Sequence, residues 1–310
     1  MKILVSTSSF GKFDKGPIEL LESHGIEVIL NPYKRQLKKE ESLELYKDID
    51  GVIAGTEKID SEVVMLAEKL KVVSRLGAGI DNVDQKALES RDIPMYYTPY
   101  GPTQAVAEFA LGMILSALRT IPQHDAKMKK GTWEKKMGNL LQSKTVGIIG
   151  LGRIGKKLVE FLKPFGVEIL AYDKFFDKDF MLQNSIQQVT LDEILVKSDI
   201  ISMHLPYHES MKNMIHASSF DLMKEDAILV NLSRGGLVDE NALYDALSSN
   251  KIRGAAFDVF SEEPYSGRLS ELDNIILTPH VASSAVEARI NMEYESAHNL
   301  LKGLGVTKND

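Results

Sequence analysis

Residues 143–155, which read SKTVGIIGLGRIG, decide the fold of this chain. The apolar run Val146–Ile149 contains β-branched residues and predicts a buried strand. Gly150, Gly152 and Gly155 follow in the spacing Gly-x-Gly-x-x-Gly, and the apolar positions beyond them recur at helical intervals. The segment therefore predicts a strand, a glycine turn and a helix.

Each glycine of such a turn has a physical use: one makes the tight turn, one leaves room for a pyrophosphate, and one lets the helix pack closely on the strand. The helix N-terminus adds unpaired N–H groups. The next predicted strand, Val167–Tyr172, ends at Asp173, where a carboxylate can bind an adenosine ribose. The pattern favours a dinucleotide site over a turn that merely packs a crossover helix. Asp173 favours NAD over NADP because it would repel a 2′-phosphate, although Lys174 beside it weakens that preference.

Composition narrows the class of protein. A chain of 310 residues is long enough for two domains, and 44% hydrophobic with 26% charged residues is typical of a globular protein. The net charge of −7 argues against nucleic acid or an anionic membrane as a partner. The lack of cysteine excludes disulfides, thiolate catalysis and cysteine–zinc sites, and it suits a reducing, cytoplasmic location. We expect no metal, no signal peptide and no membrane span.

Residues 1–98 alternate short apolar runs with amphipathic segments, which predicts a doubly wound parallel sheet. The predicted strands are Ile3–Ser6, Val28–Asn31, Gly51–Ala54, Val72–Leu76 and Met95–Thr98. The predicted helices are Pro17–Ser23, Glu41–Tyr46, Ser61–Leu70 and Asp84–Glu89. At the ligand-binding edge of this sheet, the loop Arg75–Asn82 has two glycines that let backbone N–H groups approach an anion. An ordinary strand-to-helix turn is the alternative.

Residues 144–282 alternate in the same way and predict a Rossmann sheet. Further strands are predicted at Asp199–Met203, Ala227–Leu232, Gly254–Val259 and Asn274–Leu277. Helices are predicted at Leu191–Val196, Ser218–Met223 and Glu240–Ser248. The helical pattern of residues 284–302 is expected to return to the first domain. The predicted fold is α/β, with two doubly wound parallel-sheet domains: a flavodoxin-like substrate domain (1–99 and 286–310) and a Rossmann NAD-binding domain (100–285).

The segment between these regions has a different pattern. Val106–Leu118 is apolar nearly all round, which predicts a helix buried on all sides, between two domains or inside a dimer. Arg119–Met137 is basic and amphipathic and predicts an arm, in which we interpret the only tryptophan, Trp133, as a packing residue. The expected assembly is a homodimer formed through the Rossmann domain and the 102–140 arm.

Three side chains follow successive predicted strands of the second sheet: Arg234, Glu263 and His280. They can converge at the edge where a dinucleotide would lie. A guanidinium can hold a carboxylate in a two-pronged pair, and a histidine titrates near neutrality. Taken singly, each is more often solvated or structural, and His204, which also ends a strand, competes with His280. Asp258, inside an apolar strand, needs a partner or a solvent-facing position.

Together these segments resemble the D-isomer-specific 2-hydroxyacid dehydrogenases, of the phosphoglycerate-dehydrogenase-like branch. The resemblance covers the whole chain. It is most specific in RLGAGIDNVD (75–84), VGIIGLGRIGKKL (146–158), NLSRGGLVDENAL (231–243), GAAFDVFSEEP (254–264) and TPH (278–280).

The resemblance implies an NAD-dependent oxidoreductase that transfers a hydride between nicotinamide and C2 of a small D-2-hydroxy acid or 2-keto acid. It implies that His280 exchanges a proton with the C2 oxygen, that Glu263 pairs with His280, and that Arg234 holds the substrate. The implied substrate-binding residues are Arg75, Leu76, Gly77, Ala78, Gly79 and Arg234. The implied cofactor-binding residues are Gly150, Gly152, Arg153, Ile154, Gly155, Asp173, Leu205, Leu232 and Asp258.

The sequence departs from the family pattern in two places. Phosphoglycerate dehydrogenases commonly carry Val-Arg-Ser-x-Thr after the third strand, whereas this chain has residues 53–56 as Ile-Ala-Gly-Thr. Residues 281–284, after His280, read Val-Ala-Ser-Ser, and they are expected to form a slightly bulkier wall near the nicotinamide than the family's usual segment does. D-3-phosphoglycerate, hydroxypyruvate, glyoxylate and branched keto acids all remain candidates, and the shape at Ala54, Arg75 and Tyr100 is expected to decide among them. Because the chain ends at Asp310, no regulatory serine-binding domain is expected.

Two other functions fit the same fold. One is an NAD-sensing binding module like the C-terminal-binding-protein corepressors, although nothing here resembles their disordered regulatory tail. The other is a Rossmann epimerase or lyase with tightly held NAD. Consumption of NADH with a 2-keto acid distinguishes the dehydrogenase from both.

Overall fold

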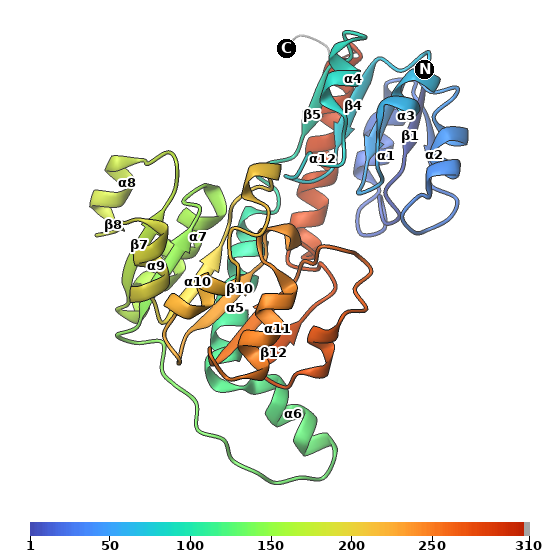
Figure 1. Ribbon diagram of the computed structural model, residues 1–310. Coiled ribbons are helices and arrows are strands. Elements are labelled where there is room, and N and C mark those ends of the chain that lie inside the picture. The colour runs from blue at the N-terminus through green and yellow to red at the C-terminus, as the bar shows by residue number, and fades with distance from the viewer. Residues whose placement is uncertain (307–310) are drawn as a thin grey trace. The chain divides into compact units, whose positions relative to one another are not determined.

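The chain folds into two compact units in a computed structural model that describes residues 1–306. One unit comprises Met1–Pro102 and Ser284–Asp310, and the other comprises Thr103–Ser283. Residues 307–310, which end the predicted segment 286–310, lie outside the described residues. Both units are α/β, as predicted, and each is built on a parallel sheet (Figure 1).

The first unit contains a five-stranded parallel sheet in the order β2-β1-β3-β4-β5, which is the flavodoxin-like order. Its strands are β1 (Lys2–Val5), β2 (Glu27–Leu30), β3 (Gly51–Ala54), β4 (Val72–Arg75) and β5 (Met95–Tyr97). Its helices are α1 (Gly16–Ser23), α2 (Lys39–Leu45), α3 (Ser61–Leu66), α4 (Gln85–Glu89) and α12 (Val286–Gly303). Helix α12 packs on α1, β3, β4 and β5, so the end of the chain completes this unit (Figure 1).

Helix α3 is shorter than the sequence pattern predicts. The predicted helix ran through Leu70, but α3 ends at Leu66 because the backbone leaves the helical region at Ala67, with ψ of 66°. The turn that follows carries Leu70 into the core, where it is 3% exposed. An apolar position at helical spacing is therefore buried by a turn here.

The second unit contains a seven-stranded parallel sheet in the order β12-β11-β10-β9-β6-β7-β8. Counted from β6, this is the Rossmann order with one strand added beyond the sixth. Its strands are β6 (Thr145–Ile149), β7 (Glu168–Tyr172), β8 (Gln187–Gln188), β9 (Ile200–Met203), β10 (Ile228–Asn231), β11 (Gly254–Phe257) and β12 (Ile275–Leu277). Its helices are α5 (Thr103–Arg119), α6 (Ile121–Lys129), α7 (Arg153–Leu162), α8 (Lys178–Gln183), α9 (Leu191–Lys197), α10 (Ala217–Leu222) and α11 (Glu240–Ser248).

Sequence patterns missed β8 and α8. Strand β8 consists of two exposed glutamines at the sheet edge, paired with Leu170 and Ala171 of β7, so no apolar alternation marks it. Helix α8 has one buried residue, Met181, and its start is fixed by the Asp177 carboxylate, which accepts a hydrogen bond from the Phe180 N–H. Such short elements carry too little periodicity to be recognised.

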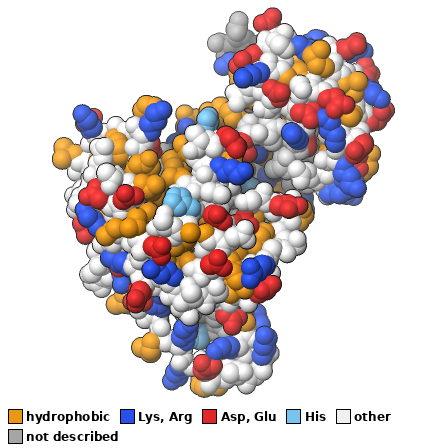
Figure 2. Space-filling model, viewed as in Figure 1, with side chains coloured by type: hydrophobic (Ala, Val, Ile, Leu, Met, Phe, Trp, Pro, Cys, Tyr) orange, Lys and Arg blue, Asp and Glu red, His pale blue; other side chains and the backbone are white. Residues whose placement is uncertain are grey.

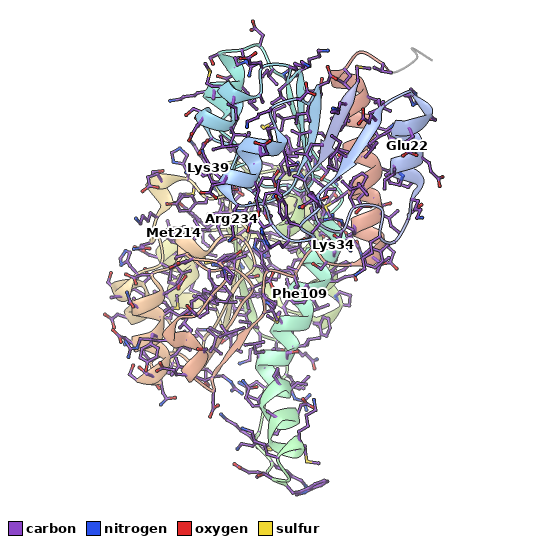
Figure 3. The ribbon with its side chains drawn as sticks, turned by 90° about the vertical axis from the view of Figure 1, so that its right-hand side faces the viewer. Glu22, Lys34, Lys39, Phe109, Met214 and Arg234 are labelled. Carbon is purple, nitrogen blue, oxygen red and sulfur yellow. The ribbon has the colours of Figure 1, made fainter. Side chains whose placement is uncertain are left out.

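Within the single chain, Val106–Leu118 is not buried on all sides, so burial of this helix inside a dimer stays a prediction. Helix α5 buries one face on α7, β10 and β11, while Glu108 and Gly112 are exposed. Phe109 (Figure 3), Leu111 and Leu115 are only partly buried, although they pack against the core. Helix α5 therefore has one buried face and one exposed face, although its side chains are apolar on nearly all sides.

Trp133 does not pack within its own chain, contrary to its interpretation as a packing residue, because this side chain is 79% exposed. None of the residues of α6 is buried, and residues 132–140 have no regular secondary structure. Lys and Arg side chains gather over α6 at the lower end of the view in Figure 2. We call residues 120–140 the arm.

Within residues 1–306, no single helix is long and apolar enough to cross a membrane. Helices α5 and α6 reach the required length only as a pair bent by 64°.

Candidate active site

The glycine turn after β6 has the shape of a phosphate cradle. Gly150 has φ of +101°, which L side chains rarely adopt, and a Cβ there would lie 2.7 Å from the His204 carbonyl carbon. A Cβ on Gly155 would lie 2.2 Å from the Gly150 carbonyl oxygen, so α7 packs directly on the turn. A Cβ on Gly152 would meet no described atom within 4 Å. The open space at Gly152, at the start of α7, is where a pyrophosphate fits.

Asp173 lies beside this turn. Its Oδ2 accepts a hydrogen bond from the Leu151 N–H at 2.6 Å, and its Oδ1 accepts one from the Phe175 N–H at 3.0 Å. The carboxylate is therefore oriented by the backbone at the carboxyl end of β7. That is where an acid can meet the ribose of a dinucleotide bound at the turn.

The other predicted cofactor residues lie at the same edge of the sheet. Arg153 and Ile154 begin α7, with Arg153 exposed and Ile154 partly buried. Leu205 follows β9 and is partly buried, and Leu232 follows β10 and is 7% exposed. A ligand on this edge would meet apolar side chains as well as the turn.

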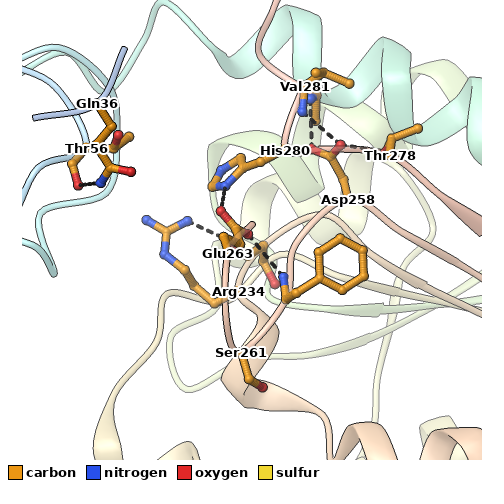
Figure 4. Close-up of polar contacts among 12 residues, drawn as sticks. Gln36, Thr56, Arg234, Asp258, Ser261, Glu263, Thr278, His280 and Val281 are labelled. Carbon is orange, nitrogen blue, oxygen red and sulfur yellow. Dashed lines mark hydrogen bonds and ion pairs between the residues drawn. The ribbon is translucent and has the colours of Figure 1, made fainter. Parts of the chain in front are cut away.

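His280 and Glu263 form a direct pair. His280 Nδ1 lies 2.8 Å from Glu263 Oε2, and their side chains are 44% and 37% exposed. The pair uses Nδ1, which leaves Nε2 to exchange a proton with a ligand. Figure 4 shows Arg234 pointing toward the same pair, with its Nη1 donating to the Ser233 carbonyl oxygen at 2.7 Å. The three side chains follow β10, β11 and β12, which are adjacent in the sheet.

The Glu263 carboxylate is surrounded by cationic groups and donors. Partial burial raises the pKa of Glu263, but the His280 hydrogen bond and charge, the Phe260 N–H and the Arg234 charge together bring it below its ordinary value. The Phe260 N–H donates to Glu263 Oε1 at 3.1 Å. Glu263 is therefore held as a carboxylate that can orient the imidazole.

Asp258 organises the turn that carries His280. It is fully buried, and it accepts hydrogen bonds from Thr278 Oγ1 at 2.5 Å, the Val281 N–H at 2.8 Å and the Ala282 N–H at 2.8 Å (Figure 4). His280 itself has φ of +54°, a left-handed conformation that costs a non-glycine residue about 1–3 kcal/mol. We assign Asp258 the role of holding this strained turn; its contact with a cofactor stays a prediction.

His204, the competitor of His280, has a different environment. Its Nε2 lies 2.9 Å from Ser202 Oγ, and burial lowers the pKa of His204 to about 4. An imidazole with such a pKa is uncharged near pH 7 and is poorly suited to general acid–base catalysis at that pH. The geometry therefore favours His280.

In the first unit, two N–H groups of the predicted anion-binding loop, Arg75–Asn82, already form hydrogen bonds within the protein. The Leu76 N–H donates to the Ala54 carbonyl oxygen at 2.8 Å, and the Gly77 N–H donates to Thr98 Oγ1 at 2.7 Å. Gly77 has φ of +134°, and a Cβ there would collide with the Arg75 guanidinium. A ligand carboxylate is therefore left with the amides of Ala78 and Gly79. Thr98 had no signal in the sequence, because its role depends on β5 lying beside β4.

Of the residues expected to shape the substrate site, Ala54 is 0% exposed and Tyr100 is 70% exposed. The Ala54 methyl is packed in the core and cannot touch a ligand. Arg75 is partly buried, and its Nη1 donates to the Leu76 carbonyl oxygen. The expectation that the shape at Ala54 helps to select the substrate is therefore wrong.

Residues 111–282 match the NAD binding domain of the D-isomer specific 2-hydroxyacid dehydrogenases. The chain belongs to this family. A relative from Archaeoglobus fulgidus named D-3-phosphoglycerate dehydrogenase is 37% identical over 99% of this chain and 58% of that protein. A relative of the same name from Methanocaldococcus jannaschii is 42% identical over 88% of this chain and 52% of that protein. The solved structure of the TT0316 protein of Thermus thermophilus has a TM-score of 0.90 and 30% identity, covering 98% of this chain and 97% of that one.

The chain spans about half the length of the curated relatives it matches. The family match covers the glycine turn, Asp173, Arg234, Glu263 and His280 up to residue 282, so the site described above falls within the NAD binding domain of a 2-hydroxyacid dehydrogenase, and NAD is the cofactor of that domain.

Two glycine substitutions separate the packing role of the turn from its binding role. Gly155→Ala places a methyl against the Gly150 carbonyl oxygen and should destabilise the protein by about 1–3 kcal/mol. Gly152→Ala projects into open space and should change the free energy of unfolding much less, yet weaken NADH binding at least tenfold because it fills the pyrophosphate position. Urea unfolding and NADH fluorescence titration measure the two effects. Equal NADH affinity in Gly152→Ala and wild type would contradict the cradle.

The environment of His204 predicts a pH dependence of stability. Between pH 6.5, its ordinary pKa, and about 4, the unfolded chain binds a proton at His204 that the folded chain excludes. The free energy of unfolding should therefore fall as the pH decreases through this window. His204→Gln should lose less stability than wild type between about pH 7 and about pH 5 in urea unfolding. The control is His208→Gln, at an exposed histidine; identical pH slopes for all three proteins would show that His204 is not buried neutral.

Proposed function

We propose that this protein is an NAD-dependent dehydrogenase that interconverts a small D-2-hydroxy acid and its 2-keto acid. The observation that carries the proposal is the His280–Glu263 pair at 2.8 Å with Arg234 directed at it, on the sheet edge that also bears the glycine turn. Oxidation of a 2-hydroxy acid needs a base for the hydroxyl proton, a cation for the oxygens and a hydride acceptor. NAD, when bound, supplies the hydride acceptor.

The side chains divide the remaining work. His280 Nε2 takes the proton from the C2 hydroxyl in oxidation and returns it in reduction, because Nδ1 is occupied by Glu263. The Glu263 carboxylate fixes the orientation of the imidazole ring through Nδ1. Arg234 holds the substrate carboxylate and stabilises the negative charge that grows on the C2 oxygen during reduction. In the first unit, the Ala78 and Gly79 amides are the loop amides that remain for a ligand carboxylate.

Replacing His280 with Ala should lower kcat by about 10²–10⁴, because proton transfer is lost. NADH affinity should stay unchanged, because the glycine turn after β6 is intact. Arg234→Ala should raise the KM for the keto acid much more than the Kd for NADH. Steady-state kinetics with NADH and glyoxylate, pyruvate or hydroxypyruvate measure both. His298→Ala, at an exposed histidine of α12, is the control. Unchanged turnover in His280→Ala would remove it from the mechanism, and no turnover by the wild type would favour an NAD-sensing module.

The proposal includes a homodimer formed through the arm and α5. Three large apolar side chains of the arm are strongly exposed: Trp133 at 79%, Met137 at 87% and Leu140 at 66%. Helix α5 leaves Leu111 and Leu115 partly exposed in the same unit. Exposed apolar groups of this kind support an interface. A cytoplasmic location is part of the same proposal, since a chain without cysteine suits a reducing compartment.

The double substitution Trp133→Asp with Met137→Asp should convert a dimer to a monomer, because it puts charges into the proposed interface. Light scattering after size-exclusion chromatography measures the mass. The control is Phe175→Asp, which changes an aromatic residue that is 77% exposed outside the arm. A monomeric wild type, or a dimeric double variant, would contradict this assembly.

A further inference from the structure

Glu263 lies in a segment of the second unit that has no regular secondary structure. Residues 258–267 connect β11 to the short 3-10 helix Arg268–Glu271, and residues 261–264 within this segment are all exposed (Ser261 and Glu263 in Figure 4). An exposed loop keeps a side chain in one geometry only where specific contacts fix the loop. The 2.8 Å contact between Glu263 Oε2 and His280 Nδ1 therefore requires an anchor for this segment.

Tyr265 attaches the segment to the core. It is partly buried between exposed neighbours, and its ring packs against a hydrophobic core cluster of the second unit. The ring stacks on Phe260, with the ring centroids 4.1 Å apart and an angle of 22° between the planes. Its Oη accepts a hydrogen bond from the Leu269 N–H at 3.1 Å. Because Phe260 and Leu269 are both buried, Tyr265 joins two fixed points on either side of Glu263.

The Tyr265 ring also fits closely against the backbone of its own segment. A Cβ on Gly267 would lie 2.4 Å from Tyr265 Oη and 2.6 Å from Cζ, so even a methyl group at position 267 would displace the ring. The residue after the exposed stretch is thus a glycine that leaves room for the tyrosine. The position of the ring is therefore set by the segment that it anchors.

Phe260 connects Tyr265 to the Glu263 carboxylate. Its N–H donates to Glu263 Oε1 at 3.1 Å, and its side chain is the ring on which Tyr265 stacks. A Cβ on Gly235, the residue after Arg234, would lie 1.9 Å from the Phe260 carbonyl carbon, so the turn after β10 packs directly on this residue. The Phe260 N–H is thus placed by contacts on both the side chain and the backbone of Phe260.

We propose that Tyr265 is a positioning residue for the reaction: its ring fixes Phe260 and the segment beyond it, so that the Glu263 carboxylate stays paired with His280 Nδ1. The inference rests on the proposed dehydrogenase function, and every contact it uses lies within the second unit. Tyr265 acts through Glu263 and exchanges no proton itself. If Tyr265 served core packing alone, its loss would lower the free energy of unfolding and leave kcat unchanged.

Two substitutions of Tyr265 test the stacked ring in steady-state kinetics with NADH and pyruvate, glyoxylate or hydroxypyruvate. Tyr265→Leu removes the ring and should lower kcat by about 10–100-fold, because small displacements of a catalytic group cost rate on this scale. The Kd for NADH and the KM for the keto acid should change by less than about threefold, since the glycine turn and Arg234 are untouched. Tyr265→Phe keeps the stack and should retain at least about one third of the wild-type kcat. Equal losses in Tyr265→Leu and Tyr265→Phe, or no loss in Tyr265→Leu, would overturn the inference.

A double-mutant cycle separates positioning from stability. Glu263→Ala removes the carboxylate that is positioned, so adding Tyr265→Leu should lower kcat by a further factor of less than about 3. Gly267→Ala displaces the ring without removing it, and its effect on kcat should depend on Glu263 in the same way even if Tyr265→Leu does not fold. Losses of kcat that multiply in the Glu263→Ala background would show that Tyr265 does not act through Glu263.

Tyr244→Leu is the matched control. Tyr244 packs against the same core cluster as Tyr265 but lies on α11, outside residues 258–267. Its replacement should lower the free energy of unfolding in urea and leave kcat within about twofold of wild type. A loss of kcat in Tyr244→Leu as large as that in Tyr265→Leu would reduce the role of Tyr265 to core packing.

A spectroscopic measurement separates this inference from the proposed function. In protein with ¹⁵N-labelled histidine at about pH 8, the ring-nitrogen chemical shifts report which nitrogen carries the proton, and His280→Ala identifies the signals of His280. Wild type and Tyr265→Phe should carry the proton on Nδ1, whereas Tyr265→Leu should show both tautomers. An unchanged Nδ1–H tautomer in Tyr265→Leu would overturn the inference while the dehydrogenase stands. If the wild type reduces none of the keto acids, the proposed function fails, and the same signals still decide whether Tyr265 positions the pair.

Discussion

The parallel direction of every strand is the constraint on which both units depend. In a parallel sheet all carboxyl ends meet at one edge, so groups far apart in the sequence become neighbours. In the second unit this rule brings together the glycine turn after β6, Asp173 after β7, and the three side chains that follow β10, β11 and β12. In the first unit it brings the loops after β1, β3 and β4 around one pocket.

In the second unit, a buried carboxylate holds the turn that carries His280. Asp258 is isolated from solvent, and the three hydrogen bonds that its carboxylate accepts all come from the turn that follows β12. The turn holds His280 in a left-handed conformation, which a peptide would otherwise avoid. The imidazole is thus aimed by the backbone before any ligand arrives, and Glu263 then selects which ring nitrogen is free. Preorganisation of this kind lowers the reorganisation needed during reaction.

Several residues of the first unit limit what a ligand could contact at the carboxyl ends of its strands. Ala54 is buried in the core. Arg289, which lines the pocket at the carboxyl ends of β1, β3 and β4, forms an ion pair with the buried Glu293. The Leu76 and Gly77 N–H groups form hydrogen bonds within the protein. The Ala78 and Gly79 amides therefore remain for a ligand carboxylate. These features belong to the first unit, whose residues before 111 lie outside the family match.

The sequence by itself determined the elements whose signal is local. The glycine spacing, the apolar strands and the side chains at strand ends can be recognised because each occupies a few consecutive residues, and the parallel-sheet rule then predicts that Arg234, Glu263 and His280 share an edge. Only the tertiary structure decided what depends on the packing of distant segments. The role of Asp258 requires β11 beside the turn after β12, and the exposure of Trp133 requires the arm to leave the core. The pocket lined by both Thr7 and Arg289 requires α12 to lie beside the loop that follows β1. No local pattern encodes these meetings, because burial is a property of the assembled fold.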